Sequence, residues 1–319
     1  MSLSSQTNLL ILRVKIPLKK ITDPHISDTG VNLFVLRLDE IHPHISGNKF
    51  FKLKYNLEEA KRQKKDTLLT FGGAYSNHIA ATAAAGKEFG FKTIGIIRGD
   101  ELQTSPRPSD DPLLIPIAIG KERVEQTLNR TLSFAKEHGM KLHFVSREEY
   151  KKKDSAEFTD SLIHTFGDFY LLPEGGTNEF AIKGCSEILP LIDIPFDFVC
   201  CPVGTGGTIA GIISSLKKDQ RAIGFSVLKG MDFSAITSKV SKTFEVMEGY
   251  HFGGYAKYTP ELLKFIDDFE KQNNIPLEQV YTGKMMFGIY DLIKKNYFPE
   301  NSTVIAIHTG GLQGKLPQL

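Results

Sequence analysis

Two short glycine-rich segments carry the side chains with the clearest chemical potential. Residues 46–49 (SGNK) place Lys49 after a glycine, and residues 72–78 (GGAYSNH) bring Ser76 and Asn77 into a second glycine turn. A lysine in such a turn, rather than on a solvated helix face, is a candidate reactive amine, because only the uncharged amine attacks a carbonyl. Lys49 therefore points to an enzyme with an imine-forming cofactor. Ser76 and Asn77 have a simpler alternative, since both residue types commonly cap helices.

A third glycine-rich turn is typical of a phosphate site. It lies between an expected strand and an expected helix and consists of Gly204, Thr205, Gly206, Gly207 and Thr208. Amide hydrogens and hydroxyls at the start of a helix bind anions well. A dinucleotide fingerprint would need a glycine at Ile209, and the lysine of a P-loop is missing. A phosphomonoester fits this turn better than a dinucleotide or a triphosphate.

Two further turns supply hydroxyl groups. Tyr255 follows a pair of glycines, and residues 280–284 (VYTGK) place Tyr281 and Thr282 just before an expected helix. By itself this second segment predicts only a helix start with Thr282 as its cap. Taken together, a turn lysine, a Ser-Asn turn and a phosphate cup indicate pyridoxal 5'-phosphate, with its aldehyde on the lysine, its ring at the asparagine and its phosphate on the glycines.

In this order the motifs resemble the family that joins 1-aminocyclopropane-1-carboxylate deaminase and D-cysteine desulfhydrase. The resemblance covers nearly the whole chain, including residues 37–39 (RLD) and 173–178 (PEGGTN). It implies the tryptophan-synthase-like fold (fold type II) of pyridoxal enzymes, usually a homodimer. A smaller domain of residues 48–160 would be inserted into a larger, cofactor-binding domain of residues 1–47 and 161–319.

The resemblance also implies roles for the residues of the first three turns. Lys49 would bind the cofactor aldehyde and later remove the α-proton of the substrate. Asn77 would bond the ring hydroxyl of the cofactor, and residues 204–208 would hold its phosphate. Ser76 would lie at the substrate carboxylate or take part in proton transfer.

The remaining matched positions concern the substrate, a small amino acid. Tyr255 and Tyr281 would face it, and Thr282 stands where true cyclopropane deaminases carry a glutamate that keeps the pyridine nitrogen protonated. A neutral hydroxyl makes a weaker electron sink, which suffices when a thiolate leaves. The resemblance thus favours β-elimination, as in a D-cysteine desulfhydrase that forms pyruvate, ammonia and sulfide. The alternatives are a cyclopropane deaminase and a non-catalytic small-molecule-binding protein.

An alternation of strands and helices must position these turns. Apolar runs predict strands at residues 31–38, 68–71, 93–97, 141–145, 196–203, 222–228 and 304–308. Amphipathic patterns predict helices at residues 53–63, 76–89, 126–137, 179–189, 209–217 and 285–295. This order is typical of an α/β fold with open, mostly parallel sheets flanked by helices, where ligands bind at the carboxyl ends of the strands.

Bulk properties exclude several other classes. The 319 residues are 41% hydrophobic and 24% charged with a net charge of +2, so nucleic acid or an anionic membrane is not an expected partner. No apolar run could span a bilayer and no signal sequence is evident, which favours the cytoplasm. Cys200 and Cys201 should be buried free thiols on opposite faces of a strand. The proline-rich segment 103–126 is expected to be a surface excursion.

Overall fold

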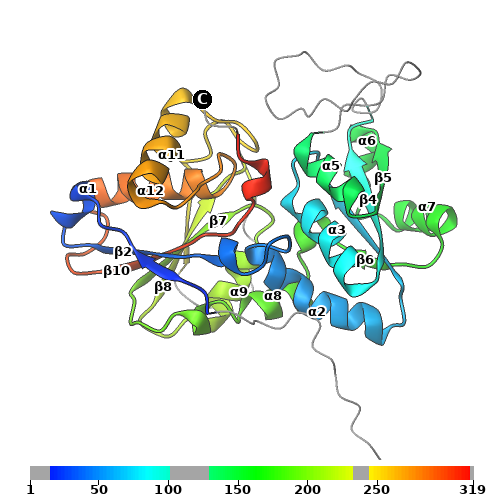
Figure 1. Ribbon diagram of the computed structural model, residues 1–319, viewed down its shortest axis with the longest axis horizontal. Coiled ribbons are helices and arrows are strands. Elements are labelled where there is room, and N and C mark those ends of the chain that lie inside the picture. The colour runs from blue at the N-terminus through cyan, green and yellow to red at the C-terminus, as the bar shows by residue number, and fades with distance from the viewer. Residues whose placement is uncertain (1–14, 101–128, 233–243, 317–319) are drawn as a thin grey trace, which may run out of the picture.

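The computed structural model describes residues 15–100, 129–232 and 244–316. The proline-rich segment 103–126 lies outside these residues, as does the expected start of the helix at 126. Figure 1 shows two lobes, each built around a sheet. Helix α2 (Asn48–Arg62), which follows the first strands, runs between them. No helix in the described parts of the chain is long and apolar enough to cross a bilayer.

The larger lobe contains a six-stranded sheet. Its strand order is β1 (Leu18–Lys20), β2 (Asn32–Leu36), β10 (Thr303–Ile307), β7 (Phe198–Val203), β8 (Arg221–Ser226) and β9 (Phe244–Met247). All neighbours are parallel except β1 and β2. The central strands are apolar along their whole length because helices cover both faces.

The smaller lobe contains four parallel strands. Their order is β5 (Met140–Val145), β4 (Lys92–Arg98), β3 (Thr67–Gly72) and β6 (Tyr170–Leu172). The predicted α/β class with mostly parallel sheets is confirmed. Strand β6 lies beyond residue 160, the predicted end of the smaller domain, so the smaller sheet takes one strand from the chain that follows. The division into domains itself stays a prediction.

Helices flank both sheets, as Figure 1 shows. Around the smaller sheet and between the lobes lie α2 (Asn48–Arg62), α3 (Asn77–Phe89), α5 (Arg130–Glu137), α6 (Arg147–Lys151) and α7 (Ala156–Phe166). The larger sheet is covered by α8 (Glu179–Cys185) and α9 (Gly207–Ser215) on one face and by α11 (Pro260–Asn273) and α12 (Thr282–Lys294) on the other, with the short α1 (Pro24–Ser27) beside α12. Four short 3-10 turns complete the described elements, at Leu38–Glu40, Glu174–Gly176, Leu189–Leu191 and Leu312–Gly314.

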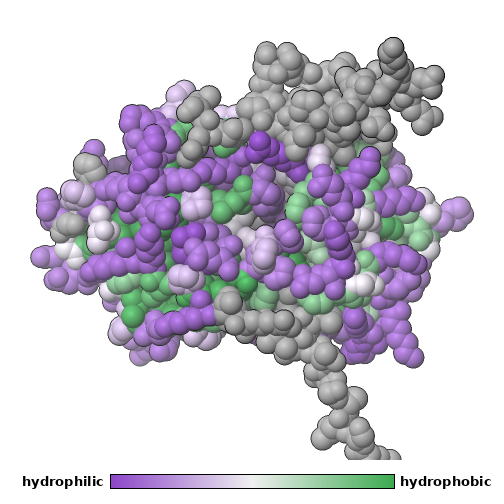
Figure 2. Space-filling model, in the orientation of Figure 1, coloured by the Kyte–Doolittle hydropathy of each residue, from purple (hydrophilic) through white to green (hydrophobic). Residues whose placement is uncertain are grey.

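The two faces of the larger sheet have separate apolar cores. Cys201 belongs to the core under α2, α8 and α9, whereas its neighbour Cys200 belongs to the core under α11 and α12. Both are fully buried free thiols, which confirms the prediction of opposite faces. Figure 2 shows polar side chains over most of the visible surface, with apolar ones gathered along the lower edge of the larger lobe.

One prediction about local structure is wrong. Lys49 does not lie in a turn; it is the second residue of helix α2, which was expected to begin only at residue 53. Gly47 is the N-cap and has a φ of 66°, a backbone conformation that favours glycine. The chain turns there, and the helix begins at the next residue. A Cβ atom on Gly47 would lie 1.9 Å from the carbonyl oxygen of Thr309, so close backbone contact also requires glycine there.

Candidate active site

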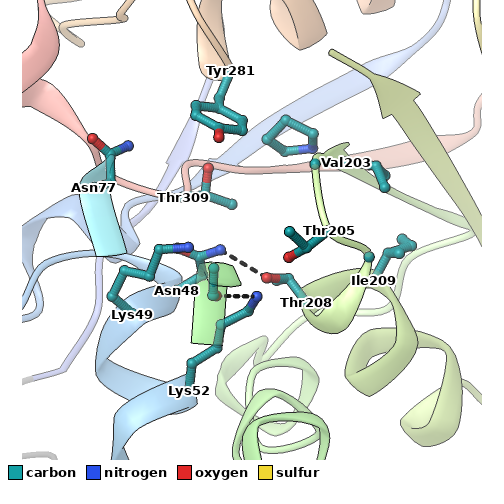
Figure 3. A pocket seen from close by; sticks show the side chains of 14 residues that line it. Asn48, Lys49, Lys52, Asn77, Val203, Thr205, Thr208, Ile209, Tyr281 and Thr309 are labelled. Carbon is teal, nitrogen blue, oxygen red and sulfur yellow. Dashed lines mark hydrogen bonds between the residues drawn. The ribbon is translucent and has the colours of Figure 1, made fainter. Parts of the chain in front are cut away.

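A pocket opens between the lobes at the carboxyl ends of β7 and β10, close to the end of β3, where parallel sheets usually bind ligands. Segments that are far apart in the sequence line it (Figure 3). They are the start of α2 up to Lys52, the first residue of α3, Gly175, the β7–α9 turn, Tyr281 before α12 and Thr309 after β10. The fold therefore brings together Lys49, Asn77, the glycine-rich turn and Tyr281, as the sequence predicted.

The Lys49 amine is partly exposed to this pocket and otherwise surrounded by protein. Burial lowers the pKa of Lys49 well below its usual value, and the neighbouring ammonium of Lys52 lowers this pKa further. No carboxylate within the described residues forms an ion pair with Lys49. Both effects favour the uncharged form of the amine, which is the form that reacts with an aldehyde.

Lys52 is a pocket residue that the sequence interpretation missed. It lies one helical turn after Lys49, is only 2% exposed, and donates hydrogen bonds to the Gly175 carbonyl at 2.9 Å and the Thr177 hydroxyl at 3.0 Å. Burial lowers the pKa of Lys52 as well; in its ammonium form the side chain has three protons, so one remains for a ligand. A Cβ on Gly207 would lie 3.1 Å from Lys52 Nζ, which places the charge against the glycine-rich turn. The spacing of three residues on one helix face was the signal for this pair.

The β7–α9 turn has the features of an anion site. Gly206 adopts a positive φ of 82°, and α9 then begins at Gly207 without a side-chain cap. The first amide hydrogens of the helix are therefore left for a ligand. Thr208 is oriented by Asn48, whose side-chain amide donates to the Thr208 hydroxyl at 2.7 Å, and Thr205 Oγ1 lies 2.6 Å from Thr177 Oγ1.

Asn77 reaches the pocket from the other lobe. Its Oδ1 accepts a hydrogen bond from Gln313 Nε2 at 2.7 Å, which leaves Nδ2 as a donor. A Cβ on Gly311 would lie 2.1 Å from Asn77 Nδ2, so the asparagine fits only against a glycine. Ser76 is the N-cap of α3 and accepts from the Ile79 amide at 3.3 Å. The simple capping interpretation of Ser76 is thus confirmed, and Ser76 does not line the pocket.

The two tyrosines stand next to each other. The rings of Tyr255 and Tyr281 have centroids 6.1 Å apart in an edge-on arrangement, and the Tyr255 hydroxyl donates to the Tyr75 carbonyl at 3.4 Å. Burial raises the pKa of Tyr255 to about 12 and that of Tyr281 well above its usual value. Both phenols therefore keep their protons at neutral pH. Only Tyr281 lines the pocket.

Thr282 is fully buried and does not line the pocket. Its hydroxyl bonds to Glu278, four residues earlier, and this carboxylate takes over the capping role predicted for Thr282. Glu278 was missed because its partners are backbone amides, which leave no pattern of residue types.

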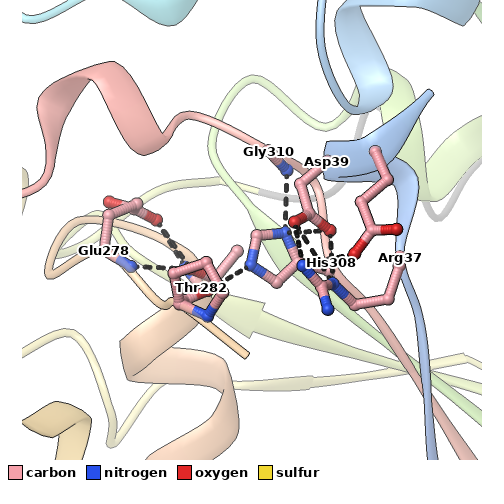
Figure 4. A network of polar contacts seen from close by, with 8 residues as sticks. Arg37, Asp39, Glu278, Thr282, His308 and Gly310 are labelled. Atoms are coloured by element: carbon pink, nitrogen blue, oxygen red, sulfur yellow. Dashed lines mark hydrogen bonds and ion pairs between the residues drawn. The ribbon is translucent and has the colours of Figure 1, made fainter. Parts of the chain in front are cut away.

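A buried polar network supports the pocket from behind (Figure 4). Arg37 forms ion pairs with Asp39 at 2.6 Å and Glu40 at 2.8 Å, and Asp39 lies 3.2 Å from His308 Nδ1. His308 Nε2 donates to the carbonyl of Pro276 at 2.7 Å. Burial lowers the pKa of His308, so the neutral ring with its proton on Nε2 is favoured. The network joins the loop after β10 to the loop before α12.

These features match the parts of pyridoxal phosphate. Lys52 and the uncapped start of α9 suit its phosphate, the uncharged amine of Lys49 suits its aldehyde, and Asn77 Nδ2 is a donor for its ring oxygen. The donor set therefore fits the cofactor that the sequence motifs predicted.

Comparisons with known proteins agree. The family model described as pyridoxal-phosphate dependent enzyme matches residues 15–310. The chain is 30% identical over 315 residues to a putative 1-aminocyclopropane-1-carboxylate deaminase of Thermotoga maritima, with 91% of each chain covered. It is also 30% identical to the bifunctional D-cysteine desulfhydrase/1-aminocyclopropane-1-carboxylate deaminase of Arabidopsis thaliana, with 89% of this chain and 73% of the relative covered.

Solved structures extend this likeness to the fold. The crystal structure of an ACC deaminase homologue aligns with a TM-score of 0.76 at 25% identity and covers 95% of this chain and 91% of the other. A cystathionine beta-synthase from Helicobacter pylori aligns with a TM-score of 0.63 at 15% identity, covering 96% and 95%. The chain belongs to the family of pyridoxal-phosphate-dependent enzymes and has their two-sheet α/β fold, fold type II.

Proposed function

We propose that the protein catalyses β-elimination from a small amino acid, as a D-cysteine desulfhydrase does. D-cysteine and water would then give pyruvate, ammonia and sulfide. The observation that carries the proposal is that the Lys49 amine, whose pKa burial lowers, lines the same pocket as the anion site of the β7–α9 turn. The names of the relatives support the substrate class, because they pair D-cysteine desulfhydrase with cyclopropane deaminase.

Two groups of residues would hold the cofactor. Residues 204–208 and Lys52 would bind the phosphate, and Asn77 would donate to the ring oxygen. Bound at Lys49, the cofactor supplies an electron sink for the pair left behind when the α-proton departs.

The chain's own groups would perform the proton transfers. Lys49 would be the base that removes the α-proton of the substrate, because burial and the nearby Lys52 lower its pKa and favour the uncharged amine. Tyr281 keeps its phenolic proton and can supply it to the departing sulfur, with Tyr255 beside it. The resemblance places Ser76 at the substrate carboxylate; its hydroxyl caps α3 as an acceptor and would still have its proton to donate there.

Two assays test the proposal. The purified protein should absorb in the visible range when bound to the cofactor, and borohydride should bleach it and fix the label on Lys49. Lys54, also on α2 but paired with Glu187, is the matched control, since Lys54→Ala should leave the label in place. Pyruvate should form from D-cysteine. A colourless, folded protein that takes up no cofactor would support the non-catalytic binding protein instead.

Cyclopropane deamination is the second candidate, favoured by the relatives named for it. Formation of 2-oxobutanoate from the cyclopropane acid, without pyruvate from D-cysteine, would replace the first proposal. Thr282→Glu should shift the ratio of the two products towards 2-oxobutanoate, if the ring-nitrogen argument applies.

The proposal also includes the setting of the enzyme. A homodimer is expected from the resemblance, with residues 48–160 as the main part of the smaller domain. The cytoplasm is the expected compartment, and the three buried free thiols are compatible with its reducing conditions.

A further inference from the structure

The turn at residues 251–256, which precedes α11, has a strained backbone. Four of its residues have a positive φ: Phe252 at 52°, Gly253 at 95°, Gly254 at 116° and Ala256 at 55°. Glycine adopts such angles readily, but in Phe252 and Ala256 they are costly, because the Cβ atom crowds the following carbonyl oxygen. A strained conformation persists only where contacts from the surrounding structure fix it, and such segments often lie at functional sites.

Lys284 supplies contacts of this kind from the first turn of α12. Its side chain is fully buried, and its Nζ donates hydrogen bonds to the His251 carbonyl at 2.9 Å and to the Gly254 carbonyl at 2.8 Å. Burial lowers the pKa of Lys284 to about 8, while the Glu278 carboxylate raises this pKa, so the ammonium form predominates at pH 7. Hydrogen bonds from a charged donor are stronger than those between neutral groups. One ammonium therefore holds two carbonyls of the strained turn in place.

The turn carries Tyr255, which links it to the pocket. The ring of Tyr255 packs edge-on against the ring of Tyr281, with the centroids 6.1 Å apart, and Tyr281 lines the pocket. The Tyr255 hydroxyl donates to the carbonyl of Tyr75 at 3.4 Å, in the loop that leads into α3 of the smaller lobe. Tyr281 lies three residues before Lys284 in the sequence. The start of α12 thus contacts Tyr255 directly through Tyr281, and it contacts the backbone beside Tyr255 through Lys284.

We propose that Lys284 is a positioning residue, which holds Tyr255 against Tyr281 by fixing the carbonyls of the turn that carries Tyr255. This inference rests on the proposed function, in which Tyr281 supplies a proton to the departing sulfur. Lys284 does not line the pocket, so its effect on turnover passes through Tyr255. A residue that only stabilised the fold would lower activity whether or not the Tyr255 ring was present. A double-mutant cycle separates these two roles.

The cycle uses the cofactor-loaded enzyme with D-cysteine as the substrate. Lys284→Met keeps the approximate length of the side chain but removes its donors, so Tyr255 should shift away from Tyr281. We expect kcat to fall by about 10- to 100-fold, as the misplacement of a group in an active site can cost. KM should change little, because no residue of the pocket lining is altered. In a Tyr255→Ala background, Lys284→Met should lower kcat no further.

A second measurement does not depend on turnover. Hydrogen exchange followed by mass spectrometry reports how often the amides of residues 250–257 open to solvent. Lys284→Met should speed their exchange and leave the amides of the β7–α9 turn unchanged. Lys294→Met is the matched control, because Lys294 is exposed in the last turn of the same helix. This control should change neither kcat nor the exchange of residues 250–257.

Three results overturn the inference but leave the proposed function intact. They are an unchanged kcat in Lys284→Met, the same loss of kcat with and without the Tyr255 ring, and unchanged exchange at residues 250–257. If Lys284→Met does not fold, Lys284→Gln takes its place with the same expectations, because its amide is too short to reach both carbonyls. Absence of the borohydride label on Lys49 in the unmodified enzyme would instead overturn the proposed function.

Discussion

The pocket and the polar network behind it use similar residue types in opposite ways. In the pocket, Lys49, the third proton of Lys52 and Asn77 Nδ2 are left for a ligand. In the network, the charges of Arg37 and Asp39 are paired. Unpaired polar groups in a confined site are costly, whereas paired ones make a rigid support. The pocket groups are therefore available to bind a ligand, whereas the network groups hold the backbone around the pocket in position. Substitutions can test each of these two roles.

The largest effect is expected at Lys49. Lys49→Ala removes both the attachment point of the cofactor and the base, so turnover should fall by about 1,000-fold or more. Steady-state rates with D-cysteine measure this, and the borohydride label should disappear as well. Retention of half the activity would show that the pocket is not the catalytic centre.

The next largest effect is expected in the network, on stability. Asp39→Asn leaves the buried Arg37 guanidinium without its main partner, which should lower the free energy of unfolding by about 3–5 kcal/mol. Urea unfolding of the cofactor-free protein measures this. Asp268→Asn is the control, because the exposed pair with Lys264 should contribute less than about 1 kcal/mol. Equal losses would contradict a supporting role for the network.

Lys52 should affect binding more than chemistry. Lys52→Met keeps the bulk of the side chain but removes its charge, so affinity for pyridoxal phosphate should fall by about 10- to 100-fold, the equivalent of one or two charge-assisted hydrogen bonds. Titration of the cofactor-free protein measures it. Pyridoxal without the phosphate is the internal control and should bind nearly as before. An equal loss for both ligands would place the ammonium elsewhere than at the phosphate.

The smallest effect is expected at Gln313, which orients Asn77 but is not among the residues that line the pocket. Gln313→Ala removes one neutral hydrogen bond and should weaken cofactor binding by about 3- to 10-fold. The same titration measures it, with Asn77→Ala for comparison. An effect larger than that of Asn77→Ala would mean that Gln313 contacts the cofactor itself.

The sequence predicted the site better than it predicted the local structure around it. Lys49, Asn77 and the turn at residues 204–208 meet in one pocket, and the glycines beside each of them made them recognisable in the sequence. The helix carrying Lys49 was nevertheless placed five residues too late, since Gly47 looked like part of a longer turn. The strands β6 and β9 were not predicted, because runs of three and four residues are too short to show a strand pattern.

Residue types and their order alone determined the α/β class, the cofactor and the reactive amine. These depend on glycine conformations and apolar periodicity, which are local properties of the chain. Only the tertiary structure decided that Lys52 faces the glycine-rich turn, that Gln313 orients Asn77 and that the Glu278 carboxylate accepts a hydrogen bond from the Thr282 hydroxyl. Such pairings depend on burial and on backbone amides, whose direction is set when distant segments pack together.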